Sequence, residues 1–339
     1  MEVIFPPKLK FGDTICLISP SSGMAKLVPH RAEKAISNLN KAGFKIKVGK
    51  NALKNLNYAS ASPQERALDL MEAFLDPEVK AIMSFIGGYC SNQILKYLDF
   101  DIIRKNPKIL VGYSDTTIPL LAIHTQTGIC TYYGPAALTQ FGENPDVFEY
   151  TLNYFKKALI EDGPIGDVFP SEFWTDQVLD WFKKLDQRSK RQTFPNQGWK
   201  WIKEGEAKGP LIGGCLVSLI NLAGTKYWPN FNNAILFWET PESDGNIHQG
   251  ISIPKTADCL EHLNELGVFN KISGMIIGRP VGYSEANHEE LICFLKDFFS
   301  NYNFPVLYNV NFGHSDPIIT IPIGQTGVLN SDNNQFKIL

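Results

Sequence analysis

Short apolar segments alternate with helical patterns through the first half of the chain, and this alternation limits the fold more than any other feature. Strand-length apolar runs occur at 14–18, 44–48, 80–86, 108–112 and 131–133. Between them, Ser62, Pro63 and Glu65 mark a helix start that is followed by apolar residues at helical spacing. Continuous apolar strands separated by helices predict a parallel sheet covered by helices on both faces. Ligands bind such sheets at the carboxyl ends of the strands.

The second half repeats the mixture of strands and helices after an interruption. Residues 171–208 are rich in charge and tryptophan and predict a linker or insertion. Beyond them, the patterns predict strands at 234–238, 274–278 and 305–310, helices at 216–222, 256–266 and 286–299, and two short strands in the tail. We therefore predict an N-terminal α/β domain over residues 1–170 and a smaller C-terminal domain of mixed strands and helices over residues 209–339.

Composition excludes several classes of function. The chain has 32 Lys and Arg against 35 Asp and Glu in 339 residues, so a nucleic acid polymer is not an expected partner. No segment approaches the ~18 consecutive apolar residues of a membrane span, and the N-terminus does not resemble a signal peptide. The six cysteines are scattered, with no C-x-x-C pair. They predict reduced core thiols in a cytoplasmic protein, which form neither disulfides nor a metal site.

A serine follows the apolar strand at 108–112 and precedes an apolar helix. Ser114 would therefore sit on a tight turn at a helix N-terminus, with the backbone N–H of Asp115 directed to the same place. These are the requirements of a nucleophile elbow with half of an oxyanion hole. Gly112 relieves crowding before the serine, although Thr116 replaces the usual second glycine. The alternative is an ordinary helix N-cap.

A second junction of this kind follows the strand at 80–86. Gly87 and Gly88 allow the backbone to approach a ligand closely and to direct an N–H at it. Gly88, or Gly87, is therefore our candidate for the second oxyanion donor. The alternative is a plain tight turn.

A nucleophilic serine needs a base, and histidine is the usual one near neutral pH. His314 lies just after the strand at 305–310, in a loop bounded by glycine and proline, and His248 is the alternative. Glu239 ends the apolar segment that begins at Ala234. A carboxylate at the end of a buried strand is costly unless it is paired, and an imidazole N–H is a suitable partner.

Several of these segments carry a resemblance to a known family. In chain order they are GDTICLISPSSG, FIGGYCSNQILKYLDFD, VGYSDTT, LIGG, ILFWE and FGHSDPIITIPIG. Together they resemble the LD-carboxypeptidase family of serine peptidases, which includes the microcin C immunity proteins. The resemblance implies a flavodoxin-like or class I amidotransferase-like N-terminal domain, an active site between two domains, and a homodimer without a cofactor. It also implies a triad of Ser114, Glu239 and His314, and an oxyanion hole formed by the backbone of Asp115, Gly87 and Gly88.

The sequence departs from the family pattern at two places. Cys215 follows the paired glycines of the LIGG segment, where the family usually has asparagine. The long segment at 171–208 resembles the microcin immunity branch, where an aromatic residue of this region stacks on a nucleobase. Trp174 is our candidate for that residue and Phe173 is the second; the alternative is packing at the domain interface.

The resemblance implies an amide hydrolase that cleaves a peptidyl- or aminoacyl-nucleotide. Two alternatives remain open at this point. One is an L,D-carboxypeptidase that removes the terminal D-amino acid of a murein tetrapeptide. The other is a non-catalytic α/β module that binds a small ligand at the same edge of the sheet, because a helix N-terminus also binds anions.

Overall fold

The computed structural model describes residues 2–339, and its first sheet contains the strands predicted for the N-terminal half. The strand order is β16-β5-β4-β3-β1-β2. The five parallel strands are β1 (Thr14–Ile18), β2 (Lys45–Val48), β3 (Val79–Ser84), β4 (Ile109–Gly112) and β5 (Tyr132–Tyr133). The edge strand β16 (Ile321–Pro322) is antiparallel to β5 and comes from the end of the chain. The predicted parallel sheet is therefore confirmed, with one antiparallel strand added from the distant C-terminal part.

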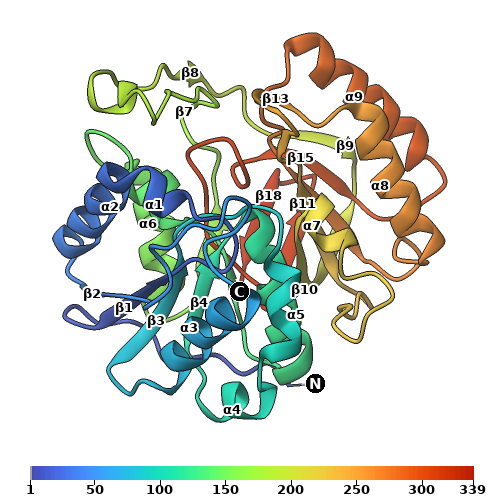
Figure 1. Ribbon diagram of the computed structural model, residues 1–339. Coiled ribbons are helices and arrows are strands. Elements are labelled where there is room, and N and C mark those ends of the chain that lie inside the picture. The colour runs from blue at the N-terminus through green and yellow to red at the C-terminus, as the bar shows by residue number, and fades with distance from the viewer. Residues whose placement is uncertain (1) are drawn as a thin grey trace.

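Helices pack around this sheet, as Figure 1 shows. They are α1 (Met24–Leu27), α2 (Pro29–Lys41), α3 (Pro63–Leu75), α4 (Phe100–Lys105), α5 (Thr117–Thr127) and α6 (Glu149–Leu159). The predicted start of α3 is confirmed, because Ser62 and Glu65 form a capping box. The segment after β3 leads into a 3₁₀ helix, Ser91–Tyr97. Its first turn is held by Asp115, which accepts from the Ser91 N–H at 2.8 Å.

The second sheet has eight strands in the order β6-β18-β17-β10-β11-β14-β15-β9. Their bounds are β6 (Gly166–Val168), β9 (Lys200–Lys203), β10 (Glu206–Cys215), β11 (Ile235–Glu239), β14 (Gly274–Gly278), β15 (Val306–Val310), β17 (Thr326–Asn330) and β18 (Gln335–Ile338). The helices of this part are α7 (Leu216–Ile220), α8 (Ile253–Glu265) and α9 (Glu285–Phe298). Strands β10, β11, β14 and β15 are parallel where they pair, so their carboxyl ends share one edge. The mixed α/β architecture with two domains is thus confirmed.

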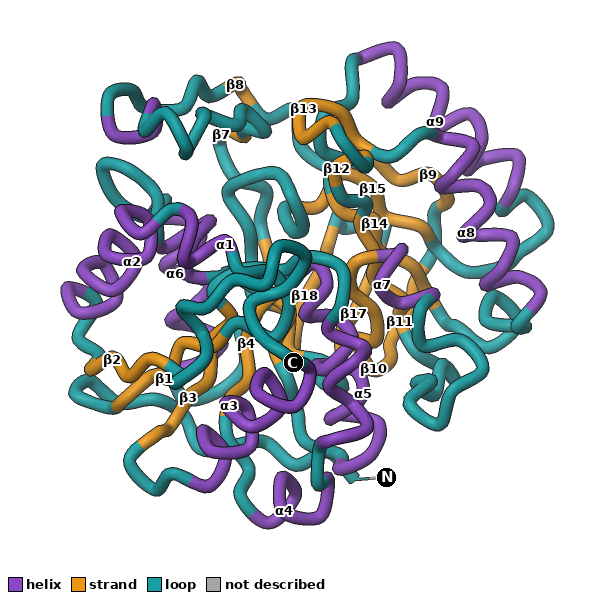
Figure 2. The backbone as a smooth tube through the Cα atoms, viewed as in Figure 1, coloured by secondary structure: helices purple, strands orange, loops and turns teal. Residues whose placement is uncertain are grey.

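The chain crosses between the two sheets more than once. Strand β6, within the range 1–170, pairs with β18 of the second sheet, whereas β16 pairs with β5 of the first. The segment 171–208 also contains structure of its own. Strands β7 (Phe173–Trp174) and β8 (Phe194–Pro195) pair with each other, and β9 joins the edge of the second sheet. In Figure 2 the β7–β8 segment lies apart from both sheets.

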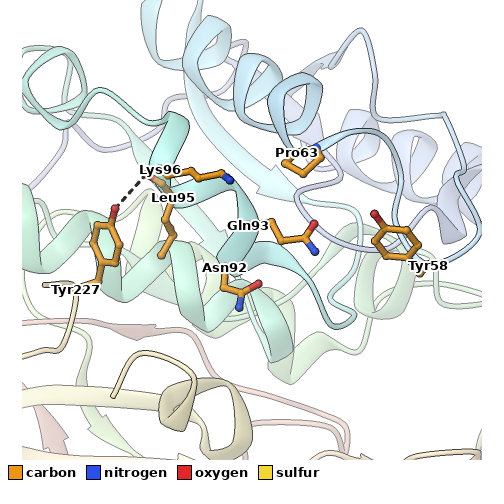
Figure 3. Close-up of a pocket in the computed structure, with 7 residues that line it drawn as sticks. All are labelled: Tyr58, Pro63, Asn92, Gln93, Leu95, Lys96 and Tyr227. Atoms are coloured by element: carbon orange, nitrogen blue, oxygen red, sulfur yellow. Dashed lines mark hydrogen bonds between the residues drawn. The ribbon is translucent and has the colours of Figure 1, made fainter. Parts of the chain in front are cut away.

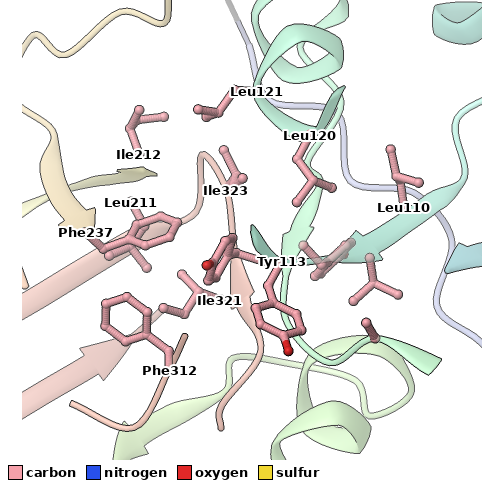
Figure 4. Close-up of a cluster of buried hydrophobic side chains, with 14 of the residues drawn as sticks. Leu110, Tyr113, Leu120, Leu121, Leu211, Ile212, Phe237, Phe312, Ile321 and Ile323 are labelled. Carbon is pink, nitrogen blue, oxygen red and sulfur yellow. The ribbon is translucent and has the colours of Figure 1, made fainter. Parts of the chain in front are cut away.

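A shared apolar cluster joins the two sheets (Figure 4). Leu110 and Leu120 belong to the first domain, whereas Phe237 and Phe312 belong to the second, and all four side chains are buried. The ring of Phe237 lies 5.6 Å from the ring of Tyr133, between centroids. Because this cluster lies beneath the carboxyl ends of β4, β5 and β11, it fixes how the two strand edges face each other. Within residues 2–339, no helix combines the length and the apolar character needed to cross a bilayer.

Candidate active site

Ser114 occupies a strained turn directly after strand β4. Its φ angle is 60°, in the left-handed region that residues with a side chain seldom adopt. The turn continues through a short 3₁₀ segment, Ser114–Thr116, into helix α5. Strain of this kind persists where the surroundings hold it, and it presents a nucleophile at the top of a sheet. The local backbone therefore has the form of the predicted nucleophile elbow.

Gly87 packs directly against the Ser114 side chain. A Cβ placed on Gly87 would lie 2.7 Å from the Cβ of Ser114 and 2.8 Å from its Oγ. The carbonyl of Gly87 accepts from the Ser22 N–H at 3.1 Å. Because the C=O and N–H of one trans peptide point in opposite directions, the Gly88 N–H is directed away from Ser22. That N–H has no hydrogen-bond acceptor within residues 2–339, which leaves it free to donate to a ligand.

Asp115 ties three loops together at the same edge. Its side chain is buried and accepts from the Ser21 hydroxyl at 2.6 Å and from the Ser91 N–H at 2.8 Å. Its carbonyl accepts from the Ser91 hydroxyl at 2.7 Å. These bonds fix the elbow relative to the loops after β1 and β3. Ser21 and Ser91 could not be predicted from the sequence, since nothing in their local pattern distinguishes them from ordinary loop serines.

Glu239 and His314 form a buried pair at the carboxyl edge of the second sheet. The His314 Nδ1 lies 2.7 Å from the Glu239 Oε2, and the two side chains are 6% and 0% exposed. Gly313 makes this approach possible: it has a φ of 104°, and a Cβ there would lie 2.5 Å from the Cγ of Glu239. The predicted partnership between the strand-end carboxylate and the imidazole is therefore present.

Tyr133, which was not predicted as a site residue, connects this pair to the elbow. Its hydroxyl donates to the Glu239 Oε1 at 2.5 Å and accepts from the Ser114 N–H at 3.4 Å. Burial is the main reason why the pKa of Tyr133 lies well above its usual value, so the phenol stays protonated and can donate. The carboxylate of Glu239 thus has one donor on each oxygen.

The His314 ring lies beside the elbow. It packs edge-on against Tyr113, the residue before Ser114, with 5.0 Å between ring centroids. Within residues 2–339, no hydrogen bond joins the Ser114 hydroxyl to His314 directly. The three predicted side chains therefore come from strand ends of both sheets. Tyr133 links the Ser114 backbone to Glu239, and a direct contact between Ser114 and His314 stays a prediction. In free enzymes such contacts are often long and shorten when substrate binds.

Opposing effects set the charge of His314. Burial lowers the pKa of its imidazole, but the carboxylates of Glu239 and Glu242 more than offset this and raise the pKa to about 9. The second nitrogen, Nε2, lies 3.7 Å from the Glu242 Oε2. At neutral pH the free protein therefore holds an imidazolium between two carboxylates. The alternative base, His248, is exposed on strand β13 (Asn246–Gly250).

Cys215 lies next to Glu239 in the second sheet. The two residues are paired in the register of β10 and β11, and the Cys215 N–H donates to the Thr117 hydroxyl at 3.0 Å. Burial, with the charge of Glu239 adding to it, raises the pKa of the thiol well above its usual value. Cys215 is therefore a neutral, buried side chain beside the pair rather than a reactive thiolate.

The two aromatic candidates of the 171–208 segment are in packing contacts. The guanidinium of Arg279 lies over the Trp174 ring, 4.4 Å from its centroid, and Trp174 also packs against Phe194. Phe173 packs against Phe148. Trp174 is nevertheless near the loop of His314, because the next residue, Thr175, forms a backbone bridge with Asp316. Their contact with a nucleobase stays a prediction.

A separate surface pocket of about 440 Å³ opens beside the 3₁₀ helix Ser91–Tyr97 (Figure 3). Its lining residues are Tyr58, Pro63, Asn92, Gln93, Leu95, Lys96 and Tyr227. The triad candidates are not among them. The pocket is therefore a neighbour of the candidate site and does not contain it. Within residues 2–339, no group of three or more His, Cys, Asp or Glu side chains has the arrangement of a metal site.

Comparison with known proteins identifies the family. Residues 15–134 match the LD-carboxypeptidase N-terminal domain, and residues 208–329 match the LD-carboxypeptidase C-terminal domain. The chain belongs to the LD-carboxypeptidase family. The resemblance seen in the sequence is thus confirmed.

Relatives within this family extend over nearly the whole chain. The microcin C7 self-immunity protein MccF of Escherichia coli is 33% identical, over 97% of this chain and 93% of its own length. A Bacillus subtilis protein named "Probable murein peptide carboxypeptidase" is 30% identical, over 96% of this chain and 91% of its own. The family thus includes proteins with two different named activities at similar distances from this chain.

Solved structures of LD-carboxypeptidase relatives share the fold. An MccF-like protein from Bacillus anthracis has a TM-score of 0.91 and 36% identity, with 99% of each chain covered. MccF in complex with aspartyl sulfamoyl adenosine has a TM-score of 0.89 and 31% identity, covering 99% of this chain and 98% of that one. These agreements place the two domains of this chain in the arrangement of the family.

Proposed function

We propose that this protein is a serine-type amide hydrolase in which Ser114 is the nucleophile, His314 the base and Glu239 the orienting carboxylate. The observation that carries the proposal is the buried 2.7 Å contact between His314 and Glu239, which Tyr133 links to the strained elbow that presents Ser114. Such an arrangement of nucleophile, base and orienting acid is recognised by geometry on many folds.

In the proposed reaction, neutral His314 removes the proton of the Ser114 hydroxyl, and the oxygen attacks an amide carbonyl. The N–H groups of Asp115 and Gly88 donate to the developing oxyanion; one such donor is worth about 3 kcal/mol in a protease of known mechanism. The imidazolium then protonates the leaving amine, while Glu239 and Tyr133 keep the ring oriented. Water attacks the acyl-enzyme by the same route, and Ser114 regains its proton.

For the substrate we favour a peptidyl- or aminoacyl-nucleotide, cleaved at the amide bond beside the nucleotide. The likeness to MccF over nearly the whole chain supports this choice, as does the long 171–208 segment. The murein tetrapeptide is the second candidate, supported by the relative from Bacillus subtilis. A homodimer and a cytoplasmic location stay predictions from the resemblance and the composition.

Incubation with each substrate, followed by mass spectrometry of the products, tests this choice. We expect cleavage of the nucleotide conjugate; cleavage of the murein peptide alone would contradict the nucleotide assignment. Ser114→Ala tests the chemistry. A hydrolase loses turnover by several orders of magnitude in this variant and loses covalent labelling by a fluorophosphonate. A binding module would keep its ligand affinity and would never have been labelled.

A further inference from the structure

The second carboxylate beside His314 has no function in the proposed reaction. The Glu242 Oε2 lies 3.7 Å from the His314 Nε2, on the opposite side of the ring from Glu239. The Glu242 side chain is 29% exposed, and within residues 2–339 it accepts no hydrogen bond. Apart from this contact with His314, Glu242 is held in place by its backbone, and part of its carboxylate is exposed to a ligand.

The backbone that carries Glu242 is a small hairpin over the site. Strand β12 (Glu242–Ser243) follows Glu239 after a two-residue turn and pairs with β13. At its far end, Gly250 packs so closely on the loop after β14 that a Cβ there would lie 2.2 Å from the carbonyl oxygen of Val281. Residues 240–250 contain two acids and no lysine or arginine. The hairpin thus places negative charge beside His314.

The position of this charge conflicts with the chemistry unless a substrate neutralises it. The Nε2 must exchange protons with both the serine hydroxyl and the leaving amine, so a carboxylate 3.7 Å away borders the reacting amide. When His314 is neutral and acts as the base, Glu242 loses its cationic partner, and its charge then opposes the negative charge that develops on the carbonyl oxygen. The other groups facing the ring do not neutralise it. Glu239 is bonded to Nδ1, Asp316 is paired with Arg191, and Tyr113 contributes an aromatic edge.

We propose that Glu242 is a specificity-determining residue that binds a protonated amino group located within about one residue of the cleaved amide bond. This inference rests on the proposed function and narrows its substrate class. Both candidate substrates can carry such a group: the diamino acid of a murein peptide, and the free α-amine of an aminoacyl-nucleotide. When the substrate ammonium draws the carboxylate to itself, Nε2 is released towards Ser114.

Binding to the inactive Ser114→Ala protein tests the inference without depending on turnover. Two matched pairs of ligands serve as probes. The first pair is a tetrapeptide with lysine or norleucine before its terminal D-alanine, and the second is an aminoacyl sulfamoyl nucleoside with a free or an acetylated α-amine. We expect the amine-bearing member of one pair to bind about tenfold or more tightly, as for a charge pair in a partly buried site. The pair that shows the difference identifies the source of the amine.

In the double variant with Glu242→Gln, this preference should fall to less than about threefold, while the acetylated or norleucine ligand binds as before. Glu289→Gln, an exposed change on α9, is the matched control and should leave the preference intact. An undiminished preference without the Glu242 charge, or no preference in either pair to begin with, overturns the inference. Absence of turnover by the unmodified protein would instead overturn the proposed function, since the binding result does not require it.

Discussion

His314 sets the pH range in which the proposed enzyme works. Its pKa of about 9 reflects carboxylates that outweigh the effect of burial. Only the neutral imidazole can accept the serine proton, so about 1% of the free protein is competent at pH 7. We therefore expect kcat/KM to rise with pH, about tenfold per unit, and to level off near pH 9. A pH profile of kcat/KM checks this, and a plateau that begins near pH 6.5 would show that the carboxylates do not act on the base.

Gly87 allows a second prediction for a single residue. An alanine there would place its Cβ 2.8 Å from the Ser114 Oγ, so the elbow must shift. We expect Gly87→Ala to lower kcat by about 100-fold, because small misplacements of reacting groups cost that much. Gly163→Ala is the control. Its φ of 91° makes alanine strained, but no atom lies within 4 Å of the new Cβ. The Gly163→Ala variant should lose about 1 kcal/mol of stability and keep its kcat. Equal losses of kcat in the two variants would argue against a specific effect of the Gly87–Ser114 contact.

The site residues differ in how visible they are in the sequence. Ser114 and His314 follow apolar strands and Glu239 ends one, so the rule that sites form at the carboxyl ends of parallel strands makes all three candidates. Their grouping as a triad came from the resemblance to the family. Tyr133 lies inside a short apolar strand and reads as a core residue. Its function depends on Glu239, which is 106 residues away and belongs to the other sheet. No local pattern carries that information.

At the scale of elements, the segment 171–208 is fastened to the loop that carries His314. Arg191 lies 2.7 Å from both Asp316 and Glu143, and all three side chains are largely buried. Gln140 donates to the other oxygen of Asp316 at 3.0 Å. The loop that holds His314 is thereby clamped between the first domain and the insertion. In the sequence this segment reads as a charged linker, because the partners of its arginine lie far away along the chain.

Removing the ion pairs of Arg191 should allow the loop that carries His314 to move. We expect Arg191→Met to destabilise the protein by about 3–5 kcal/mol, because two buried carboxylates lose their partner. In the folded variant, kcat should fall more than KM rises, since the variant changes the position of His314 rather than substrate contacts. Arg188→Met is the control, because Arg188 is exposed on the same segment. Urea unfolding and steady-state kinetics measure both effects. An unchanged kcat would show that Arg191 does not position His314.

At the scale of the whole molecule, the two parts of the chain exchange strands between the two sheets. The predicted strand–helix alternation was enough to assign the class of the first sheet. The exchange of β16 into that sheet could not be predicted, because its two residues pair with β5 through contacts almost 190 positions apart. Such pairing depends on where the second domain docks. The docking surface is the apolar cluster of Figure 4, whose residues look like ordinary core positions in the sequence.

This cluster also supports the candidate site. Substitutions in it should therefore affect activity as well as stability, whereas substitutions elsewhere in the core should affect stability alone. Phe237 packs against Tyr133, whose hydroxyl holds Glu239. Phe299 is equally buried, but it packs among the aromatic rings around α9. We expect Phe237→Ala and Phe299→Ala each to cost about 3–5 kcal/mol of unfolding free energy, as is usual for a buried phenylalanine.

At a temperature where both variants remain folded, only Phe237→Ala should also lower kcat, because the cavity frees Tyr133 and lets the two strand edges shift. Denaturant unfolding and kinetics on the same preparations make this comparison. Equal retention of kcat in both variants would mean that the docking of the domains tolerates a cavity beside the triad. The alignment of the two sheets would then depend on the clamp at Arg191 and on the strand exchange rather than on the shared core.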